Sequence, residues 1–123
     1  MSARDRRRDE WRGRVAESVA AWWLRAKGYR VLARRLRLGV GEIDLVVARG
    51  RALVLVEVKR RATLDLAAEA LGQGRLRRVW RAVPVAAARF GDGWETVRLD
   101  AVLVAPWRFP RHLERIAGED GSC

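Results

Sequence analysis

Cysteine and histidine are almost absent from the sequence, which has one of each in 123 residues. Cys123 is the last residue and can form no internal disulfide, which fits a reducing compartment and predicts a cytoplasmic protein. A zinc site built from thiolates and imidazoles is excluded, because it would need three or four such ligands. Any metal site must therefore use carboxylates and water, the ligands that hard cations such as Mg²⁺ or Mn²⁺ prefer.

Long hydrophobic runs are also missing. No apolar stretch approaches the roughly 18–20 residues that are needed to cross a bilayer, and the basic residues 1–14 lack the apolar segment of a secretory signal. We therefore expect no membrane-bound form. The length suits a single domain over residues 1–123, and the highly charged residues 1–8 and the small polar residues 118–123 are expected to be flexible tails.

Lysine is the third scarce residue, with 2 among 26 basic residues, yet the net charge is +11. Genome base composition could explain the preference for arginine, but it does not explain the excess of bases over acids. Such an excess favours polyanionic partners. We expect nucleic acid rather than an acidic membrane surface, because no long helix combines a basic face with an uninterrupted apolar one.

The periodicity of the apolar residues predicts the order helix, three strands, helix and strand. Strands are expected over residues 29–38, 42–48, 52–58 and 95–104, and helices over residues 9–27, 67–71 and 75–83, with a last short helix over 112–116. Pro84 should end or kink its helix. Because a helix joins the third strand to the fourth, these strands should be parallel. The chain is thus predicted to be an α/β protein whose helices cover both faces of a mixed sheet.

The first helix and the tryptophans suggest which side chains form the core. Apolar residues recur at spacings of three and four in the first helix, which predicts a buried stripe: Val15, Val19, Trp22, Trp23 and Ala26. Trp80 is expected in the core as well. Trp94 and Trp107 lie near loops, where stacking on unpaired bases is the alternative to core packing.

Three charged residues, Asp44, Glu57 and Lys59, interrupt the most apolar segment, GEIDLVVARGRALVLVEVKRR (residues 41–61). Burial of a charge is unfavourable unless it is paired or binds a metal. A hairpin turn centred on Gly50-Arg51 would place Asp44 directly opposite Glu57, and a turn centred one residue earlier would place it diagonally. Both registers keep the two carboxylates and Lys59 on one face, because side chains alternate along a strand.

This cluster has two interpretations. Directly opposed residues have Cβ atoms about 4.5–5.5 Å apart, so the two carboxylates would repel each other unless a divalent cation lay between them. Lys59 would then orient a water or stabilise a phosphate oxygen, and a lysine is notable in a chain that otherwise uses arginine. Alternatively, the three residues form a structural ion cluster. The apolar flanks and the positive charge of the chain favour a site.

The segment Asp44 followed by Glu57-Val58-Lys59 resembles the PD-(D/E)xK nuclease superfamily. More narrowly, GEIDL (41–45) with VEVKRR (56–61) resembles the YraN family of uncharacterised bacterial proteins. The similarity covers nearly the whole chain and includes Gly13 and Glu17 in the first helix, Gly28-Tyr29 at its end, Gln73 at the start of the second long helix, and RLDAV (98–102) in the last long strand. Two positions depart from it: Ile43 replaces the superfamily's proline, and Gly72 replaces a residue that is often basic.

The resemblance implies a restriction-endonuclease-like, three-layer α/β/α fold. By analogy with archaeal Holliday-junction resolvases it implies a metal-dependent endonuclease that hydrolyses phosphodiester bonds in structured or branched nucleic acid, with DNA expected before RNA. In that reading Asp44 and Glu57 bind Mg²⁺ or Mn²⁺, the Val58 carbonyl is a third ligand, and Lys59 positions the attacking water. Since resolvases act through two sites together, a homodimer is compatible. The alternatives are a non-catalytic nucleic-acid-binding module and an interaction protein whose charged cluster is structural.

Further residues are candidates for the same site or its surroundings. Glu17 could complete the metal coordination through water or be an ordinary solvated glutamate, and Gln73, at a helix start, could bind phosphate or only cap the helix. Five arginines are expected to contact the nucleic-acid backbone: Arg35, Arg37, Arg60, Arg61 and Arg75. We expect Asp100 to be structural and paired with Arg98 or another nearby arginine, and we assign His112 no role.

Overall fold

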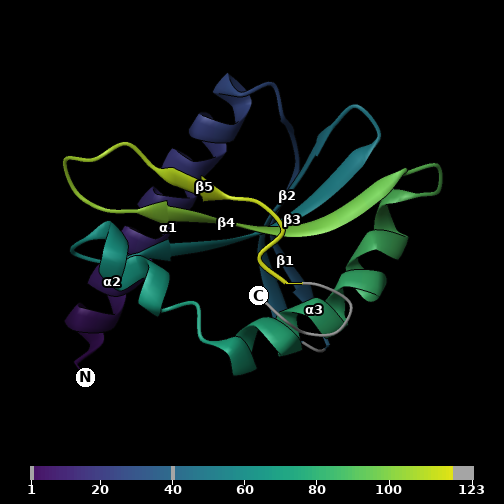
Figure 1. Cartoon of the computed structure of the whole chain (residues 1–123). Coiled ribbons are helices and arrows are strands. Elements are labelled where there is room, and N and C mark those ends of the chain that lie inside the picture. Colours follow the sequence, from purple (N-terminus) through teal and green to yellow (C-terminus); the bar gives the residue numbers. More distant parts are fainter. Residues whose placement is uncertain (1, 40, 118–123) are drawn as a thin grey trace.

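The chain folds as a five-stranded mixed sheet between helices (Figure 1). The computed structural model describes residues 2–39 and 41–117, without the side chains of residues 73–78. The elements follow in the order α1 (Ala3–Ala26), β1 (Arg30–Leu38), β2 (Gly41–Arg49), β3 (Ala52–Arg60), α2 (Leu64–Glu69), α3 (Gln73–Ala87), η1 (Ala88–Phe90), β4 (Thr96–Val104) and β5 (Arg111–Leu113). The helix–strand order therefore agrees with the α/β prediction up to β4.

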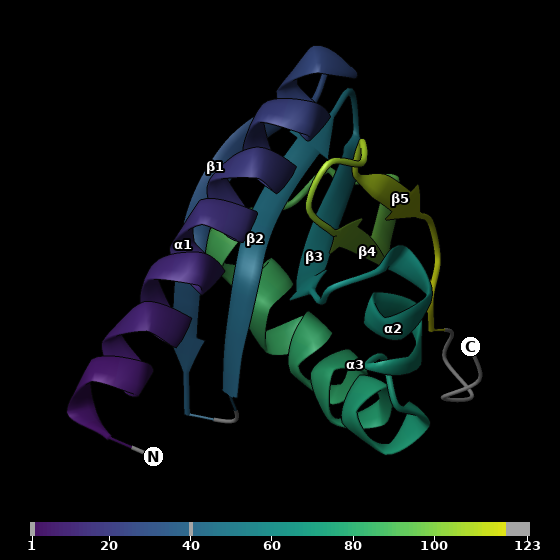
Figure 2. The same ribbon diagram turned by 90° about the vertical axis from the view of Figure 1, so that its left-hand side faces the viewer.

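The strands lie in the sheet in their sequence order, from β1 to β5. β1, β2 and β3 form an antiparallel meander, β4 runs parallel to β3, and β5 pairs antiparallel with β4. The parallel pair follows from the helical crossover between β3 and β4, as predicted. Figure 2 shows α1 across one face of the sheet and α3 behind the other, so the predicted three-layer arrangement is confirmed.

Each face of the sheet has its own apolar layer. On one face, alanines and Leu24 of α1 pack against buried residues of the central strands: Leu45, Val47, Val54, Val56, Val102 and Val104. On the other face, Ala82, Val83 and Ala86 of α3 pack against a second set: Ile43, Val46, Leu53, Leu55, Leu99 and Ala101. Both layers bury the middle of β2, β3 and β4, which makes these strands a firm support for polar residues at their ends.

The predicted buried stripe of α1 is wrong for Val15, Trp22 and Ala26, which are exposed, while Val19 is partly buried against the core. The side chains of α1 that enter the core are Ala16, Glu17, Ala20, Ala21 and Leu24, whereas Trp22 is 60% exposed. Small alanine side chains let the helix backbone lie close to the sheet, and a row of tryptophans would hold it away. Trp23 is only half-buried, and its ring packs against Phe109 with 5.6 Å between the centroids.

The other tryptophans divide between core and surface. Trp80 and Trp94 are partly buried and pack against the α3 side of the core, as expected for Trp80. The indole N–H of Trp94 donates to the Phe90 carbonyl at 3.2 Å. Trp107 is fully exposed in the loop between β4 and β5. Core packing therefore describes Trp94 but not Trp107.

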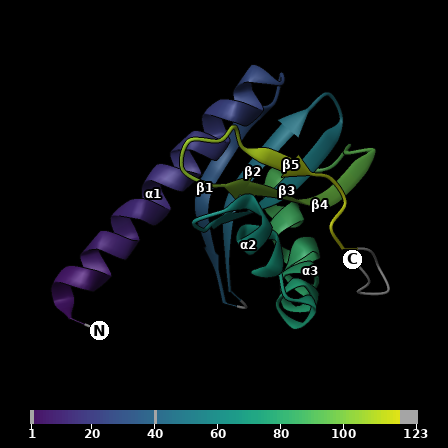
Figure 3. The same ribbon diagram turned by 60° about the vertical axis from the view of Figure 1, so that its left-hand side comes forward.

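α1 is longer than predicted, and its N-terminal half projects beyond the sheet (Figure 3). The helix begins at Ala3 rather than near residue 9, with Ser2 as its N-cap. The Ser2 hydroxyl oxygen accepts from the Asp5 N–H at 3.1 Å, which satisfies one of the free amides at the helix start. Residues 2–15 are all exposed. None of the described helices combines the length and the apolar character of a membrane span.

The structure also differs from three other local predictions. α3 continues through Pro84 to Ala87, so the proline does not end the helix. Residues 111–113 form the strand β5 instead of a short helix, because the edge of β4 offers hydrogen-bond partners that a local helix signal cannot outweigh. α2 also begins at Leu64, earlier than the predicted residue 67. The predicted tail 118–123 lies outside the described residues.

Candidate metal centre

The turn between β2 and β3 fixes where Asp44 lies. Arg49 pairs with Ala52, so the two central turn residues are Gly50 and Arg51. Gly50 has a φ of 58°, a left-handed conformation that glycine adopts without strain. The same register pairs Leu45 with Val56, and Asp44 and Glu57 are the next residues of the two strands beyond that pair. The first of the two predicted turns is therefore the one that forms.

The regular alternation of side chains is interrupted at Asp44. Ile43 packs in the α3 layer, yet Leu45 packs in the α1 layer, although two residues so spaced on a regular strand share a face. On the neighbouring strand, Arg35 has a left-handed φ of 52°. The expectation that strict alternation orients Asp44 is therefore wrong. Its carboxylate oxygen Oδ2 instead accepts a hydrogen bond from the Val58 N–H of β3 at 2.8 Å.

Glu57 and Lys59 do share a face of β3. They alternate with Val56 and Val58, whose side chains pack on the α1 side. Lys59 Nζ lies 3.0 Å from Glu57 Oε1, and their side chains are 9% and 1% exposed. An ion pair this well buried needs close geometry to offset its desolvation. Glu57 is therefore held firmly, and Lys59 compensates its negative charge.

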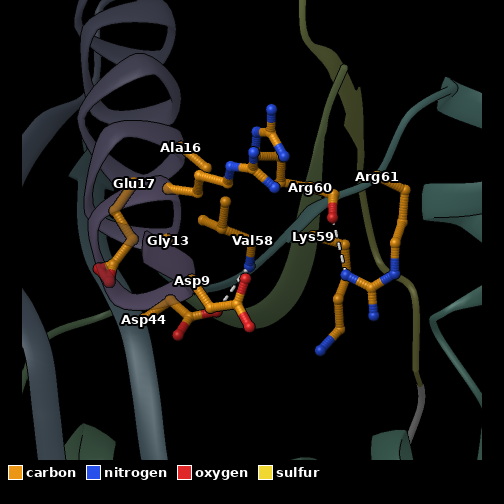
Figure 4. A pocket seen from close by; sticks show the side chains of 10 residues that line it. Asp9, Gly13, Ala16, Glu17, Asp44, Val58, Lys59, Arg60 and Arg61 are labelled. Carbon is orange, nitrogen blue, oxygen red and sulfur yellow. Dashed lines mark hydrogen bonds between the residues drawn. The ribbon is translucent and has the colours of Figure 1, made fainter. Parts of the chain in front are cut away.

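A cavity of about 290 Å³ opens at the end of β3 beside α1 (Figure 4). Asp44, Val58 and Lys59 line it from the sheet, with Arg60 and Arg61 following. α1 supplies the other wall: Asp9, Arg12, Gly13, Ala16 and Glu17. Glu57 is not part of this wall. The structure thus brings Asp44, Val58, Lys59 and Glu17 together around one opening and leaves Glu57 behind them.

The surroundings of Asp44 disfavour the ionised form of its carboxylate. Burial, and next the negative charge of Glu57, raise the pKa of Asp44 to about 7, with Glu17 adding to the rise. The hydrogen bond from Val58 and the charge of Lys59 act in the opposite direction but do not cancel it. Asp44 and Glu57 therefore lie close enough to repel each other, and Lys59 does not neutralise both.

This donor set suits Mg²⁺ or Mn²⁺. No group of three or more His, Cys, Asp or Glu residues arranged to hold a metal is found among the described residues. Mg²⁺ does not require one, because it commonly binds through one or two carboxylates and keeps several waters. Asp44, Glu57 and the Val58 carbonyl would be the protein ligands. Burial is the main cause of the raised pKa of Asp44, and a divalent cation there would offset the second cause, the repulsion from Glu57.

Glu17 is engaged by an arginine. Arg35 Nε donates to both carboxylate oxygens, at 2.7 and 2.9 Å, and the hydrogen bond to Glu17 raises the pKa of Arg35. Glu17 is 7% exposed, so it is not an ordinary solvated glutamate. Arg35, which was predicted to contact a phosphate group, is therefore already paired with the Glu17 carboxylate. Arg37 is exposed and lies 3.6 Å from Glu42.

The remaining predicted site residues fall at different places. Arg60 is half-buried and Arg61 exposed, and both line the cavity. Arg61 donates to the Arg60 carbonyl at 2.7 Å. Gln73 begins α3 as predicted, and Gly72 is its N-cap. The side chains of Gln73 and Arg75 lie outside the described residues.

Sequence reasoning missed the α1 side of the cavity. Asp9, Arg12 and Gly13 line it but were not predicted as site residues. Their spacing with Glu17 places them on one side of a helix, which is a signal the sequence contains. The apolar periodicity of α1 points to a different helix face as the buried one, and this polar side of the helix therefore does not stand out as part of a site.

A second polar cluster lies around Asp100, away from the cavity. The side chain of Asp100 is fully buried and pairs with Arg98 Nε at 3.0 Å, as expected for a structural role. His112 Nε2 lies 2.6 Å from Asp100 Oδ2, and the Arg115 N–H donates to Oδ1 at 3.1 Å. Burial tends to raise the pKa of Asp100, but these hydrogen bonds together hold it below its usual value. The sequence assigns no role to His112, but in the structure its contact with Asp100 helps to hold β5 against β4.

Comparisons with known proteins agree on one family. The model of the uncharacterised protein family UPF0102 matches residues 16–104. A UPF0102 protein of Sphingopyxis alaskensis is 49% identical over 110 residues, covering 87% of this chain and 92% of the relative. Another, from Rhizorhabdus wittichii, is 46% identical over 107 residues, covering 87% and 91%. A third, from Bartonella bacilliformis, is 43% identical over 116 residues, covering 94% and 95%. The chain therefore belongs to the uncharacterised protein family UPF0102, the YraN family that its motifs resemble.

Proposed function

We propose that this protein is a divalent-metal-dependent nuclease that hydrolyses phosphodiester bonds in structured or branched DNA. The observation that carries the proposal is the state of Asp44. Its carboxylate is fixed by the Val58 N–H at the wall of an open cavity, and its pKa is raised by burial and by Glu57. Perturbed carboxylates in a cleft are typical of functional sites.

Each residue around the cavity would have its own role in such a reaction. Asp44, Glu57 and the Val58 carbonyl would hold Mg²⁺ or Mn²⁺, which polarises a phosphate and lowers the pKa of a bound water. Lys59 lines the same cavity and can donate a hydrogen bond to that water or to a phosphate oxygen. The Glu57–Lys59 pair keeps both side chains in place.

The cavity rim is suited to a polyanion. Arg12, Arg60 and Arg61 line it and offer their charges to the phosphates on either side of the scissile bond. The chain has two lysines, Lys27 and Lys59, and of these only Lys59 lines the cavity, next to the three arginines. A compact ammonium can approach a water nucleophile, whereas a guanidinium serves better as a phosphate clamp.

A cleavage assay tests the proposal. Labelled branched, linear duplex and single-stranded DNA are incubated with Mg²⁺ or Mn²⁺, and with EDTA as the metal-free reference. We expect cleavage only with the divalent ions, and Asp44→Asn and Lys59→Met should lower its rate by about 100-fold or more. Asp92→Asn is the matched control, because Asp92 is an exposed acid in the turn before β4 and should be without effect. Cleavage that survives Asp44→Asn would come from a contaminant and reject the proposal.

A non-catalytic nucleic-acid-binding module is the second candidate. Glu57 favours it, because that side chain is 1% exposed, is paired with Lys59 and does not line the cavity. A carboxylate held in this way serves a structural ion pair as well as it serves a metal. This candidate predicts DNA binding that weakens with salt, that is the same in Mg²⁺ and in EDTA, and that leads to no cleavage.

A further inference from the structure

The outward face of α1 exposes large apolar side chains that neither the core nor the candidate metal centre uses. Trp11 is 65% exposed and Trp22 is 60% exposed. They line a shallow hollow along the helix together with four other residues: Arg14, Val15, Ser18 and Val19. We call these six residues the α1 strip. Exposed apolar surface of this kind marks an interaction site.

Arginines surround the α1 strip. At about 100° of rotation per residue, Arg4 and Arg8 fall on the same side of α1 as the two tryptophans, and Arg12 lies at its margin toward the cavity. Arg7, Arg14 and Arg25 follow one edge of that side, and all six arginines are exposed. The helical rotation turns the acids of α1 away from the middle of the strip: Asp5, Asp9, Glu10 and Glu17. The strip is therefore complementary to a polyanion, and it would repel a second copy of itself.

Nucleic acid fits the α1 strip better than a lipid surface does. A helix that lies in a membrane interface needs a broad apolar face, whereas here the apolar residues form a narrow row interrupted by Ser18 and bordered by arginines. Aromatic rings interleaved with basic residues are the usual means of binding a single strand, because bases stack on the rings while cations contact the phosphates.

The α1 strip and the candidate metal centre lie on different sides of α1, and Arg12 lies between them. Trp11 belongs to the strip, and the next residue, Arg12, lines the cavity that contains Asp44. Trp11 and Trp22 lie about 16 Å apart along the helix axis, which is room for a few nucleotides. A strand that leaves the cavity past Arg12 would have to cross over α1 to reach the strip.

We propose that the α1 strip binds an unpaired segment of the DNA substrate, with bases stacked on Trp11 and Trp22 and phosphates held by the neighbouring arginines. This inference rests on the proposed function and narrows its substrate class to DNA that contains a single-stranded segment within a few nucleotides of the cleavage point. Branched and flapped DNA have such segments, and a fully paired duplex does not.

Fluorescence anisotropy in EDTA tests the proposal without any need for catalysis. The probes are a labelled oligothymidylate and a labelled duplex of the same length. Trp11→Ala and Trp22→Ala should each raise the Kd for the single strand by about 5- to 100-fold and leave the Kd for the duplex nearly unchanged. Trp11→Phe should restore most of the affinity, because a phenyl ring still stacks. Val85→Ala is the control, since it removes an exposed apolar side chain from α3, on the other face of the sheet.

Each other outcome overturns the proposal. The proposal is rejected if single-strand affinity is unchanged in Trp11→Ala and Trp22→Ala, if duplex and single strand lose affinity equally, or if Val85→Ala loses as much affinity as they do. Binding to phosphatidylserine vesicles that depends on Trp11, with oligothymidylate binding unaffected, would assign the strip to a membrane. Metal-dependent cleavage by the same proteins separates the two proposals. Strip-dependent binding without cleavage rejects only the nuclease, and cleavage with unchanged single-strand binding rejects only the strip.

Discussion

At the scale of single residues, Asp44 has the strongest consequence for the metal-free protein. Its pKa is about 7 in the folded state and about 3.9 in an unfolded chain. Between these values the folded protein binds a proton that the unfolded chain does not. The free energy of unfolding should therefore fall as the pH rises from about 4 to about 7, and remain low above that range.

Replacing Asp44 by asparagine should remove this dependence. At about pH 8 the metal-free Asp44→Asn variant is expected to be more stable than the wild type by about 1–3 kcal/mol, while near pH 4 the two should be alike. The asparagine side-chain oxygen can still accept from the Val58 N–H, so only the charge is lost. Urea denaturation in EDTA measures the difference. Adding Mg²⁺ at pH 8 should stabilise the wild type and not the variant, and equal stabilities across the whole range would contradict the raised pKa.

The sequence identifies which charged residues form the candidate site, but it does not predict how their side chains are oriented. Asp44, Glu57 and Lys59 stand out because charge is improbable in so apolar a segment, and the hairpin register follows from Gly50. The turn of Asp44 toward Val58 could not be predicted, because it depends on an irregularity shared with Arg35 of β1. Residue types thus define the candidate site, and contacts between distant segments decide how each side chain points.

At the scale of elements, α1 shows why periodicity alone can select the wrong face. Its tryptophans and valines give the larger hydrophobic signal, but its alanines and Leu24 give the closer packing. A helix can therefore carry two apolar stripes, and in α1 the stripe with the smaller side chains is the one that packs against the sheet. The strands were predicted more faithfully, since β2, β3 and β4 are buried on both faces and read as continuous apolar runs.

Two substitutions in α1 separate these stripes. Leu24 is fully buried, so Leu24→Ala should lower the free energy of unfolding by about 2–5 kcal/mol. Trp22→Ala removes the larger side chain from an exposed position and should change it by less than about 0.5 kcal/mol. Chemical denaturation of both variants measures this contrast. A large loss of stability in Trp22→Ala would mean that the tryptophan stripe, rather than the alanine stripe, faces the sheet.

The strand β5 depends on the buried carboxylate of Asp100. Asp100 accepts hydrogen bonds from Arg98 and from the Arg115 N–H and lies against His112 of β5. Asp100→Ala would leave these groups unpaired in the interior and should lower the free energy of unfolding by about 3–5 kcal/mol. Hydrogen exchange should show early loss of protection in residues 111–113. Asp65→Ala, at an exposed acid in α2, is the control that should leave both measurements unchanged.

At the scale of the whole molecule, the charge distribution links the candidate metal centre to the α1 strip. The cavity lies at one end of β3, and arginines of its rim and of α1 extend the positive surface to both sides. The fold itself, a three-layer sandwich with a parallel β3–β4 pair, was predictable because the order of its elements leaves few arrangements. Which surface collects the charge was not predictable, since it depends on which face of α1 turns outward.

The salt dependence of DNA binding should report this charge distribution. Each phosphate that the protein neutralises contributes about −0.9 to the slope of log K against log salt for duplex DNA. Arg12→Gln and Arg61→Gln, both at the cavity rim, should each make the slope shallower by about one unit. Arg89→Gln removes the same charge from η1, at the end of α3 on the opposite face of the sheet, and should leave the slope unchanged. Anisotropy titrations over a range of NaCl concentrations measure all four proteins. If Arg89→Gln lowered the slope as much as the rim variants do, DNA would be attracted by the net charge of +11 as a whole and not by the surface around Asp44.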